Sequence, residues 1–168
     1  QFNWGNADKI ANFCRENGIK LRGHCLCWHA QFADWMFEGE NGEPASKELF
    51  YERLRTHIHA VVNRYKDIVY AWDVVNEAVE EREEQGWRQR SGWYQTIGEE
   101  FLLYAFRFAR KYAAEGVKML YNDDNTMLPF KRDFICENIL KPLVAEGVVD
   151  GMGMQSHLVL GAHSLVDY

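Results

Sequence analysis

Apolar residues recur at two different spacings along this chain, and segments of the two kinds alternate. Spacings of three and four residues, typical of a helix with one buried face, predict helices within residues 7–14, 46–65, 97–112 and 129–143. Extended apolar runs predict strands over residues 19–27, 68–75, 117–121 and 148–154. The predicted order is one helix, then a strand followed by a helix three times, then a last strand.

Turn and cap residues mark where several of these elements begin or end. Asn17-Gly18 stops the first helix, Ser46 caps the second, and Pro129 suits the first turn of the fourth. Pro142 should kink or end that fourth helix, and Ser164 is placed to cap a further one. The side chains predicted to face inward are Phe50, Leu54, His57/Ile58, Val61 and Tyr65; Ile97, Phe101, Tyr104/Ala105, Phe108 and Tyr112; and Phe130, Phe134, Ile139 and Leu143.

Alternating strands and helices indicate a parallel sheet with helices packed outside it. Polar or aromatic groups appear where each apolar strand ends: His24 with Trp28 and His29, Asp73 with Asn76 and Glu77, Asn122 with Asp123, and Gln155 with His157. In α/β barrels the active site is built from such strand ends. The glycine-rich phosphate motifs of open doubly wound sheets do not occur in the sequence. We therefore predict an α/β fold, a partial (β/α)8 TIM barrel with about four of the eight strands.

Composition narrows the class of protein further. Of 168 residues, 47% are apolar and 26% charged, which is enough to form a core, and the net charge of −6 without a basic cluster argues against a nucleic-acid partner. No apolar run is long enough for a membrane span. A complete barrel takes about 250 residues, so we expect residues 1–168 to be one incomplete catalytic barrel without a second domain.

The four cysteines give little information about function. Cys25 and Cys27 are two apart in an extended run, a spacing that fits no zinc motif. Together with Cys14 and Cys136 they are interpreted as buried free thiols.

Glu77 is the strongest catalytic candidate in the sequence. It follows a buried apolar strand and has aromatic neighbours, so we expect desolvation to raise its pKa and let it donate a proton near neutral pH. The alternative is a structural role, in which Glu77 caps the following segment or pairs with Arg82. His24 and His29 are open to two other interpretations, as core histidines or as metal ligands, although their spacing is not a standard metal pattern.

Several motifs, in order along the chain, resemble one family. They are RGHCLCWH at 22–29, HIHAVVNRYKD at 57–67, WDVVNEA at 72–78, RSGWY at 90–94, YND at 121–123 and GMGMQSHL at 151–158. Together they resemble glycoside hydrolase family 10, the retaining endo-β-1,4-xylanases, over essentially the whole chain and over the third to sixth strands of that family's barrel. The resemblance implies hydrolysis of internal bonds of xylan without a cofactor or metal.

The resemblance also implies a role for each matching residue. Glu77 would be the general acid/base, and Asn76 would bond the 2-hydroxyl of the −1 sugar. His24 and Trp28 would line the −1 subsite, and Gln31 would reach the −2 sugar. Gln155 and His157 would lie near the acid/base and the nucleophile. Trp87 and Trp93 are candidates for the border of the leaving-group side.

Two departures from the family pattern concern catalysis. Asp124 occupies a position where the family usually has a Tyr that lines the leaving-group side. The family's nucleophilic Glu lies in a TEL-type motif downstream of the QSH at 155–157, which this sequence does not include. We therefore expect the isolated chain to be inactive and to require the remaining barrel segments of a longer parent protein.

Three alternatives stay open at this point. The chain could be a non-catalytic xylan-binding remnant, a metal-dependent barrel hydrolase that uses His24, His29 and Asp123, or half a barrel with no site at all. Because xylan is a polymer too large to enter a cell, we expect the parent protein to be secreted or held at the cell surface or in the periplasm.

Overall fold

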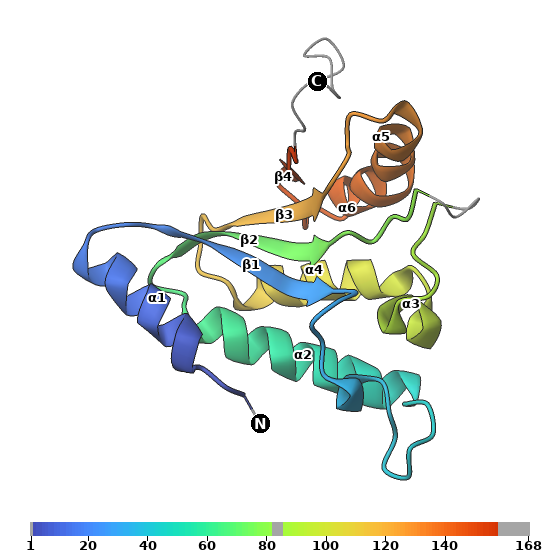
Figure 1. Ribbon diagram of the computed structural model, residues 1–168, viewed down its shortest axis with the longest axis horizontal. Coiled ribbons are helices and arrows are strands. Elements are labelled where there is room, and N and C mark those ends of the chain that lie inside the picture. The colour runs from blue at the N-terminus through green and yellow to red at the C-terminus, as the bar shows by residue number, and fades with distance from the viewer. Residues whose placement is uncertain (1, 82–85, 158–168) are drawn as a thin grey trace.

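The computed structural model describes residues 2–81 and 86–157 of the chain. Helices and strands alternate in the predicted order (Figure 1). The helices are α1 (Gly5–Glu16), α2 (Lys47–Arg64), α3 (Gly92–Ile97), α4 (Glu100–Tyr112), α5 (Pro129–Ile135) and α6 (Lys141–Ala145), with a 3-10 turn at Asp34–Met36 and a π turn at Cys136–Leu140. The strands are β1 (Leu21–Trp28), β2 (Val69–Asn76), β3 (Lys118–Asp123) and β4 (Gly151–Met154). Ser164 lies outside the described residues.

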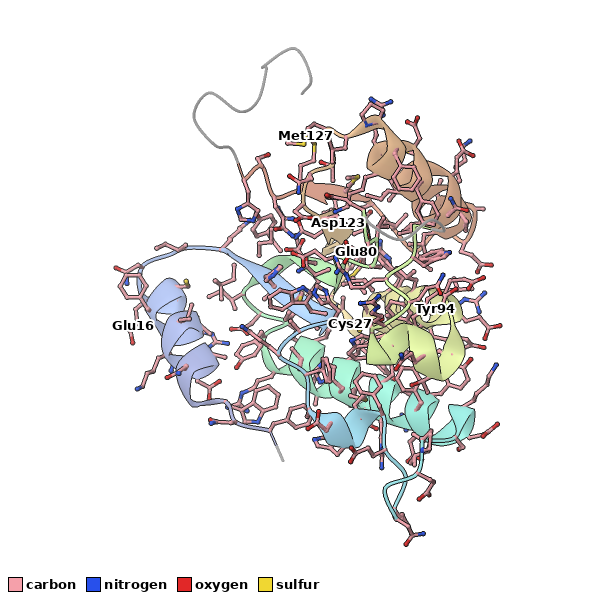
Figure 2. All side chains as sticks on the ribbon, turned by 45° about the vertical axis from the view of Figure 1, so that its right-hand side comes forward. Glu16, Cys27, Glu80, Tyr94, Asp123 and Met127 are labelled. Atoms are coloured by element: carbon pink, nitrogen blue, oxygen red, sulfur yellow. The ribbon has the colours of Figure 1, made fainter. Side chains whose placement is uncertain are left out.

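The four described strands form one parallel sheet in the order β1-β2-β3-β4. At its carboxyl edge Trp28 pairs with Asn76, and Asn76 pairs with Asn122. Glu16, which precedes β1, lies at one edge of the molecule, away from Asp123 at this edge of the sheet (Figure 2). This sheet, with helices between successive strands, confirms the predicted partial (β/α)8 barrel and brings the polar strand ends together.

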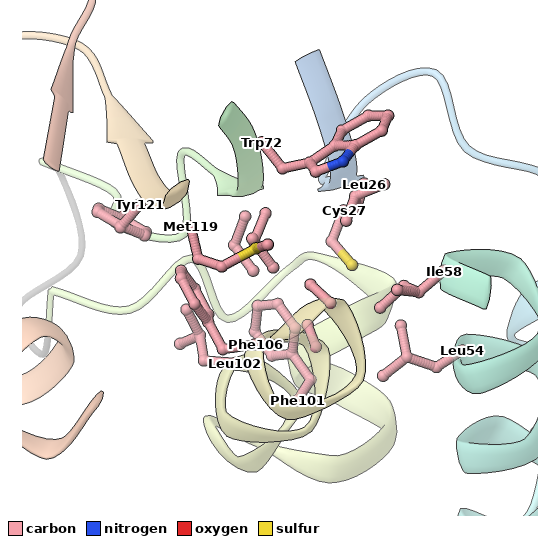
Figure 3. Packing of buried hydrophobic residues seen from close by; sticks show 14 of the residues in the cluster. Leu26, Cys27, Leu54, Ile58, Trp72, Phe101, Leu102, Phe106, Met119 and Tyr121 are labelled. Atoms are coloured by element: carbon pink, nitrogen blue, oxygen red, sulfur yellow. The ribbon is translucent and has the colours of Figure 1, made fainter. Parts of the chain in front are cut away.

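One face of the sheet packs against α2 and α4 (Figures 1 and 3). The core combines large side chains from both layers: Leu26, Cys27, Leu54, Ile58, Trp72, Phe101, Phe106, Met119 and Tyr121. In β2 every residue except Tyr70 is buried, as predicted for a central strand. Gly23 in β1 is required by this packing, because a Cβ there would lie 2.2 Å from the Trp72 ring.

Helix α2 follows the sequence prediction closely. The Ser46 hydroxyl accepts a hydrogen bond from the Leu49 N–H, which caps the helix as predicted. Phe50, Leu54 and Ile58 are fully buried on its inner face, although Val62 is buried where Val61 was expected.

The prediction of one inward helical face over residues 97–112 is partly wrong: Ile97, Phe101 and Ala105 are buried as predicted, but the segment forms two helices. Gly98, at φ 66° and ψ −156°, separates α3 from α4, and this backbone region is essentially restricted to glycine. The fully covered side chains of α4 are Phe101, Leu102, Ala105, Phe106 and Ala109, whereas Phe108 and Tyr112 are only partly buried.

The inward face predicted for residues 129–143 is also partly wrong. Ile139 and Leu143 are buried, but Phe130 is 50% exposed and Lys131 takes the inward position. The π turn precedes Pro142, which cannot donate a backbone hydrogen bond, and α6 ends at Ala145. Lys131 is directed inward because buried carboxylates lie there, as described below.

The cysteines are free thiols, as interpreted from the sequence. Cys14 and Cys27 are buried and Cys25 and Cys136 partly buried, without a disulfide among them. Within residues 2–81 and 86–157, no helix combines the length and apolar character that a membrane crossing requires.

Candidate active site

A cavity of about 520 Å³ opens at the carboxyl ends of the strands. Its lining includes six of the seven residues that the sequence selected. They are His24, Trp28, Asn76, Glu77, Gln155 and His157, joined by Arg22, Asp73, Asn122 and Met154. These side chains come from all four strands or from the residues directly after them, as the barrel architecture requires.

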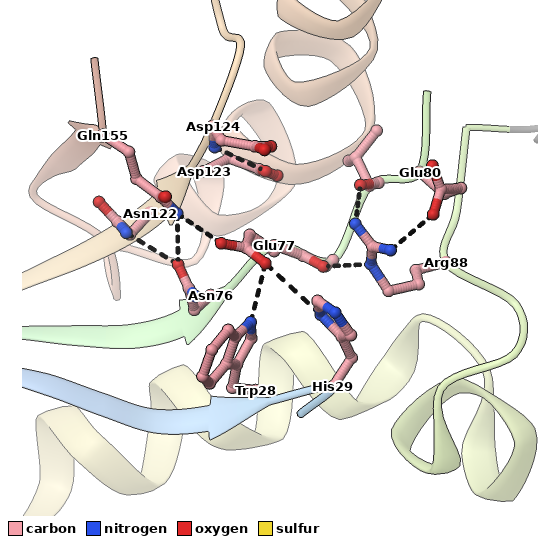
Figure 4. Close-up of polar contacts among 12 residues, drawn as sticks. Trp28, His29, Asn76, Glu77, Glu80, Arg88, Asn122, Asp123, Asp124 and Gln155 are labelled. Atoms are coloured by element: carbon pink, nitrogen blue, oxygen red, sulfur yellow. Dashed lines mark hydrogen bonds and ion pairs between the residues drawn. The ribbon is translucent and has the colours of Figure 1, made fainter. Parts of the chain in front are cut away.

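The Glu77 carboxylate is held between two strands that are not neighbours in the sheet (Figure 4). The Trp28 indole Nε1–H donates to Oε2 over 2.8 Å, and the Gln155 amide Nε2–H donates to Oε1 over 2.7 Å. His29 Nδ1 lies 3.7 Å from Oε2. The carboxylate therefore has fixed partners from β1 and from the end of β4, rather than the structural role of a cap. Arg82, the other partner considered, lies outside the described residues.

The expected upward shift of the Glu77 pKa is wrong for this chain. Burial raises the pKa, but the hydrogen bonds from Gln155 and Trp28 lower it by more, so that the net pKa lies below its usual value. The negative charge of Asp124 raises the pKa of Glu77, and the nearby His29 ring lowers it. Two donors aimed at the carboxylate outweigh partial desolvation, because they stabilise its charged form.

The pKa of the His29 ring lies below its usual value. Burial lowers its pKa, and the charge of Arg88 lowers it further, although Glu77 acts in the opposite direction. Its buried Nδ1 has no hydrogen-bond partner. Because Nδ1 lies near the Glu77 carboxylate, His29 belongs to the site, and the sequence could have indicated this from its position directly after the predicted strand.

A chain of amide groups lies beside Glu77. Asn76 Oδ1 accepts hydrogen bonds from Asn122 Nδ2 (2.8 Å) and from Gln155 Nε2 (3.1 Å). His157 Nε2 lies 2.8 Å from Gln155 Oε1, so the ring nitrogen donates to the amide oxygen. These contacts fix the orientation of both amides. The Asn76 side-chain oxygen already accepts two hydrogen bonds from the protein.

Buried Asp73, itself held by the partly exposed Arg22, supports His24. The Arg22 Nε and Nη2 donate to Asp73 Oδ1 over 2.9 and 2.6 Å, and His24 Nδ1 lies 3.0 Å from Asp73 Oδ2. A carboxylate only accepts, so His24 Nδ1 carries the proton and Nε2 remains an acceptor in the neutral ring. Sequence reasoning selected His24 but not Arg22, although their spacing of two along a strand places both side chains on one face.

Gln31 does not share the cavity with Glu77. It lines a neighbouring cavity of about 840 Å³, to which His24 and Trp28 also contribute. The candidates Trp87 and Trp93 do not line the Glu77 cavity either. Trp93 is buried in the core and donates its indole N–H to the Trp28 carbonyl over 2.7 Å, while Trp87 packs edge-on against Phe134.

Asp123 points to the other side of β3 and does not line the Glu77 cavity. It is fully buried and pairs with Lys131 Nζ at 2.9 Å, and burial raises its pKa to about 6. Asp123 is thus directed away from the cavity that His24 lines, which argues against a metal site that combines Asp123 with His24 and His29. Among the described residues there is no group of three or more His, Cys, Asp or Glu side chains able to hold a metal ion.

Comparison with known proteins places this geometry in a family. The model of glycosyl hydrolase family 10 matches residues 1–167. The chain is 52% identical to an endo-1,4-beta-xylanase/feruloyl esterase of Xylanibacter ruminicola, covering 93% of this chain and 23% of that protein. It is 49% identical to endo-1,4-beta-xylanase A of Thermotoga maritima, covering 95% of this chain and 15% of that protein.

The fold agrees with the same family. A solved psychrophilic glycoside hydrolase family 10 endo-beta-1,4-xylanase superposes with a TM-score of 0.91 at 45% identity, covering 99% of this chain and 52% of that one. The chain thus spans about half of that solved structure and less than a quarter of the two relatives. The family match, the sequence identity and the fold agree, and the chain belongs to glycosyl hydrolase family 10.

Proposed function

We propose that this chain is the part of a retaining endo-β-1,4-xylanase that carries the general acid/base, and that its parent protein hydrolyses internal xylosidic bonds of xylan. The observation that carries the proposal is the Glu77 carboxylate, which lines a cavity at the carboxyl ends of four parallel strands. Family membership and the endo-xylanase names of the relatives support the substrate class.

Each side chain of the cavity has a proposed task. Glu77 protonates the leaving oxygen and then activates water. The Asn76 amide nitrogen donates to the 2-hydroxyl of the −1 sugar, since its oxygen already accepts from Asn122 and Gln155. His24 Nε2 accepts from a sugar hydroxyl, and the Trp28 ring covers an apolar face of the sugar.

Two further roles are proposed for residues at the edges of this site. Gln31 binds the −2 sugar from the neighbouring cavity, which adjoins the first at His24 and Trp28. His157 orients the Gln155 amide and, in the parent protein, bonds the nucleophilic carboxylate.

The nucleophile is proposed to come from outside these 168 residues. Retaining hydrolysis uses two carboxyl groups about 5–5.5 Å apart. Among described residues the carboxylates that line the cavity are Asp73 and Glu77, and Asp73 is engaged by Arg22 and His24. A second carboxylate at that distance would also raise the Glu77 pKa, which the acid role requires and which this chain alone does not provide. We therefore propose that the isolated chain is inactive.

The test is Glu77→Gln in the parent protein, assayed on β-1,4-xylan and on an aryl xylobioside with a good leaving group. We expect loss of xylan hydrolysis, while release of the aryl group, which needs little protonation, is much less affected. Added azide should then restore turnover of the aryl substrate by replacing the water that Glu77 activates.

The matched control is Glu16→Gln, the same change at the exposed end of α1 and outside the Glu77 cavity (Figure 2), which should leave both activities unchanged. Unchanged xylan hydrolysis by Glu77→Gln would contradict the proposed acid/base role. A parent protein that binds xylan without hydrolysing it would instead support the non-catalytic remnant. We also propose that the parent protein acts outside the cytoplasm, which fractionation of its host cells would test.

A further inference from the structure

The backbone turn at Glu77 is hydrogen-bonded to the hydroxyl of a buried tyrosine, Tyr121. Glu77 has φ 54°, in the left-handed region that residues other than glycine seldom adopt. The next backbone N–H, of Ala78, donates to the Tyr121 hydroxyl over 3.1 Å. Tyr121 is fully buried in β3, and its hydroxyl in turn donates to the Asp123 carboxylate. The backbone directly after Glu77 therefore depends on a side-chain hydroxyl of the neighbouring strand.

The Tyr121 hydroxyl is itself held by a buried ion pair. Asp123 Oδ1 lies 2.9 Å from Lys131 Nζ and accepts from the Asp124 N–H at the same distance. Neither Asp123 nor Lys131 is appreciably exposed, at 0% and 1% of the side chain. Lys131 also contacts Asp124 at 2.5 Å and Glu81 at 3.3 Å. Helix α5 is thus linked through Lys131 and Asp123 to the hydroxyl that supports the Glu77 turn.

Further hydrogen bonds, with Arg88 and with the β3 backbone, hold the same turn. Arg88 Nε donates to the Glu77 carbonyl over 2.9 Å, the Arg88 N–H donates to the Ala78 carbonyl over 2.8 Å, and the Glu77 N–H donates to the Asn122 carbonyl over 2.9 Å (Figure 4). None of these bonds involves the Ala78 N–H, which donates to the Tyr121 hydroxyl. Because the two donors to the Glu77 carboxylate come from different strands, a small rotation of this turn would lengthen at least one of those bonds.

We propose that Tyr121, Asp123 and Lys131 are positioning residues, a buried network that fixes the left-handed turn at Glu77 and so directs its carboxylate between Trp28 and Gln155. None of the three residues lines the cavity, and the hydroxyl of Tyr121 reaches the turn through the Ala78 backbone N–H. That the network fixes the turn can be tested without activity, whereas its effect on catalysis rests on the proposed function of Glu77.

Charged and titratable groups on every neighbouring element lie around the turn at Glu77, and of these Asp124 raises and His29 lowers the pKa of its carboxyl. They are His29 after β1, Arg88 in the segment after β2, Asp124 after β3 and His157 after β4, with Lys131 on α5 behind them. Changing the Tyr121 hydroxyl alters none of these charges. A change in Glu77 titration after that substitution therefore reports a moved carboxylate.

The test is Tyr121→Phe in the isotope-labelled chain, with Tyr65→Phe as the matched control. Tyr65 is also buried and its hydroxyl also donates to a carboxylate, that of Asp8 over 3.0 Å, but it lies at the end of α2. Two signals are followed by nuclear magnetic resonance: the indole N–H of Trp28 and the carboxyl carbon of Glu77 during a pH titration. The spectrum of Glu77→Gln assigns the carboxyl signal.

We expect Tyr121→Phe to shift the Trp28 indole signal and to raise the pKa of Glu77, because weaker donor bonds no longer offset burial. Tyr65→Phe should change neither. Asp123→Asn is the second variant: its amide would donate toward the Tyr121 hydroxyl and compete with the Ala78 N–H, so the same shift of the Trp28 signal and the same rise of the Glu77 pKa are expected. Because loss of the Asp123 charge would by itself lower the Glu77 pKa, a rise again reports a moved carboxylate. If both signals are unchanged in either folded variant, the proposal is overturned.

In the parent protein the same variants should lower kcat by about tenfold to hundredfold with little change in KM, as for a displaced catalytic group. If that protein proves unable to hydrolyse xylan, the proposed function fails, but the two spectroscopic signals still decide whether the network positions Glu77. An unchanged kcat in an active parent protein, with Glu77→Gln inactive, would overturn the catalytic consequence alone.

Discussion

Replacing Asp73 by Asn should both weaken the fold and reverse the hydrogen-bonding character of His24. Asp73 is 3% exposed and accepts two hydrogen bonds from Arg22 and one from His24 Nδ1. Asparagine has the same shape but no charge. Its oxygen can keep the Arg22 contacts, whereas its amide N–H₂ then faces His24 Nδ1 and must donate to it. The ring proton moves to Nε2, so the atom that faces the cavity becomes a donor.

The expected loss in the free energy of unfolding follows from the number and exposure of these hydrogen bonds. Hydrogen bonds to charged groups contribute about 1.5–3 kcal/mol and neutral ones about 0.5–1.5 kcal/mol, so three bonds that lose their charge cost about 3–4 kcal/mol when fully buried. The side chains of Arg22 and His24 are 38% and 48% exposed, and solvent screening reduces the figure to about 2 kcal/mol. For a chain of this size that corresponds to a Tm lower by about 4–8 °C.

The measurement is urea and thermal unfolding of the chain, followed by circular dichroism. The matched control is Asp67→Asn, because Asp67 accepts the same two-pronged contact from Arg15, at 2.7 and 2.8 Å, on the surface. With side chains 35% and 56% exposed, that pair is screened by solvent and should contribute much less than the Asp73 contacts. Two-bond nitrogen–proton spectra of the imidazole ring identify the His24 tautomer directly.

Two results together would refute the reasoning. One is a free energy of unfolding for Asp73→Asn that equals that of Asp67→Asn, which would mean that burial adds nothing to this contact. The other is a His24 ring that still carries its proton on Nδ1 in the variant, which would mean that Asp73 does not set the tautomer.

Two further predictions concern the site and the core. Trp28→Phe removes one of the donors that lower the Glu77 pKa, so this pKa should rise; a carboxyl titration that is unchanged would show that the indole contact has no effect. Phe106→Ala in the fully buried core should lower the free energy of unfolding by about 3–5 kcal/mol, whereas Val144→Ala, at a side chain that is 63% exposed, should change it by less than about 0.5 kcal/mol. Equal effects of the two alanine variants in urea unfolding would contradict the assignment of the core.

Much of this fold can be read from the sequence, because helices and strands have different periods. The apolar run of residues 68–75 predicts a central strand, and β2 is that strand. Ser46 marks the start of α2 through a cap that involves only local chain geometry. Since the carboxyl ends of parallel strands share one edge, the gathering of His24, Asn76 and Gln155 around Glu77 also follows from order alone.

Other features depend on contacts that the local pattern does not contain. Lys131 replaces Phe130 on the inner side of α5, because Asp123 and Asp124 lie there to pair with it. The break at Gly98 divides the segment into two helices, and a repeat of apolar positions that continues across it cannot reveal it.

The site shows the same division between sequence and tertiary structure. The sequence by itself determined the family, the order of the elements and the identity of Glu77 as the leading candidate. Only the tertiary structure decided the direction of its pKa, since the donors Trp28 and Gln155 lie 49 and 78 residues away along the chain. The physical reason is that secondary structure is set by neighbours within a few residues, whereas the electrostatics of a carboxylate are set by whichever groups the folded sheet brings against it.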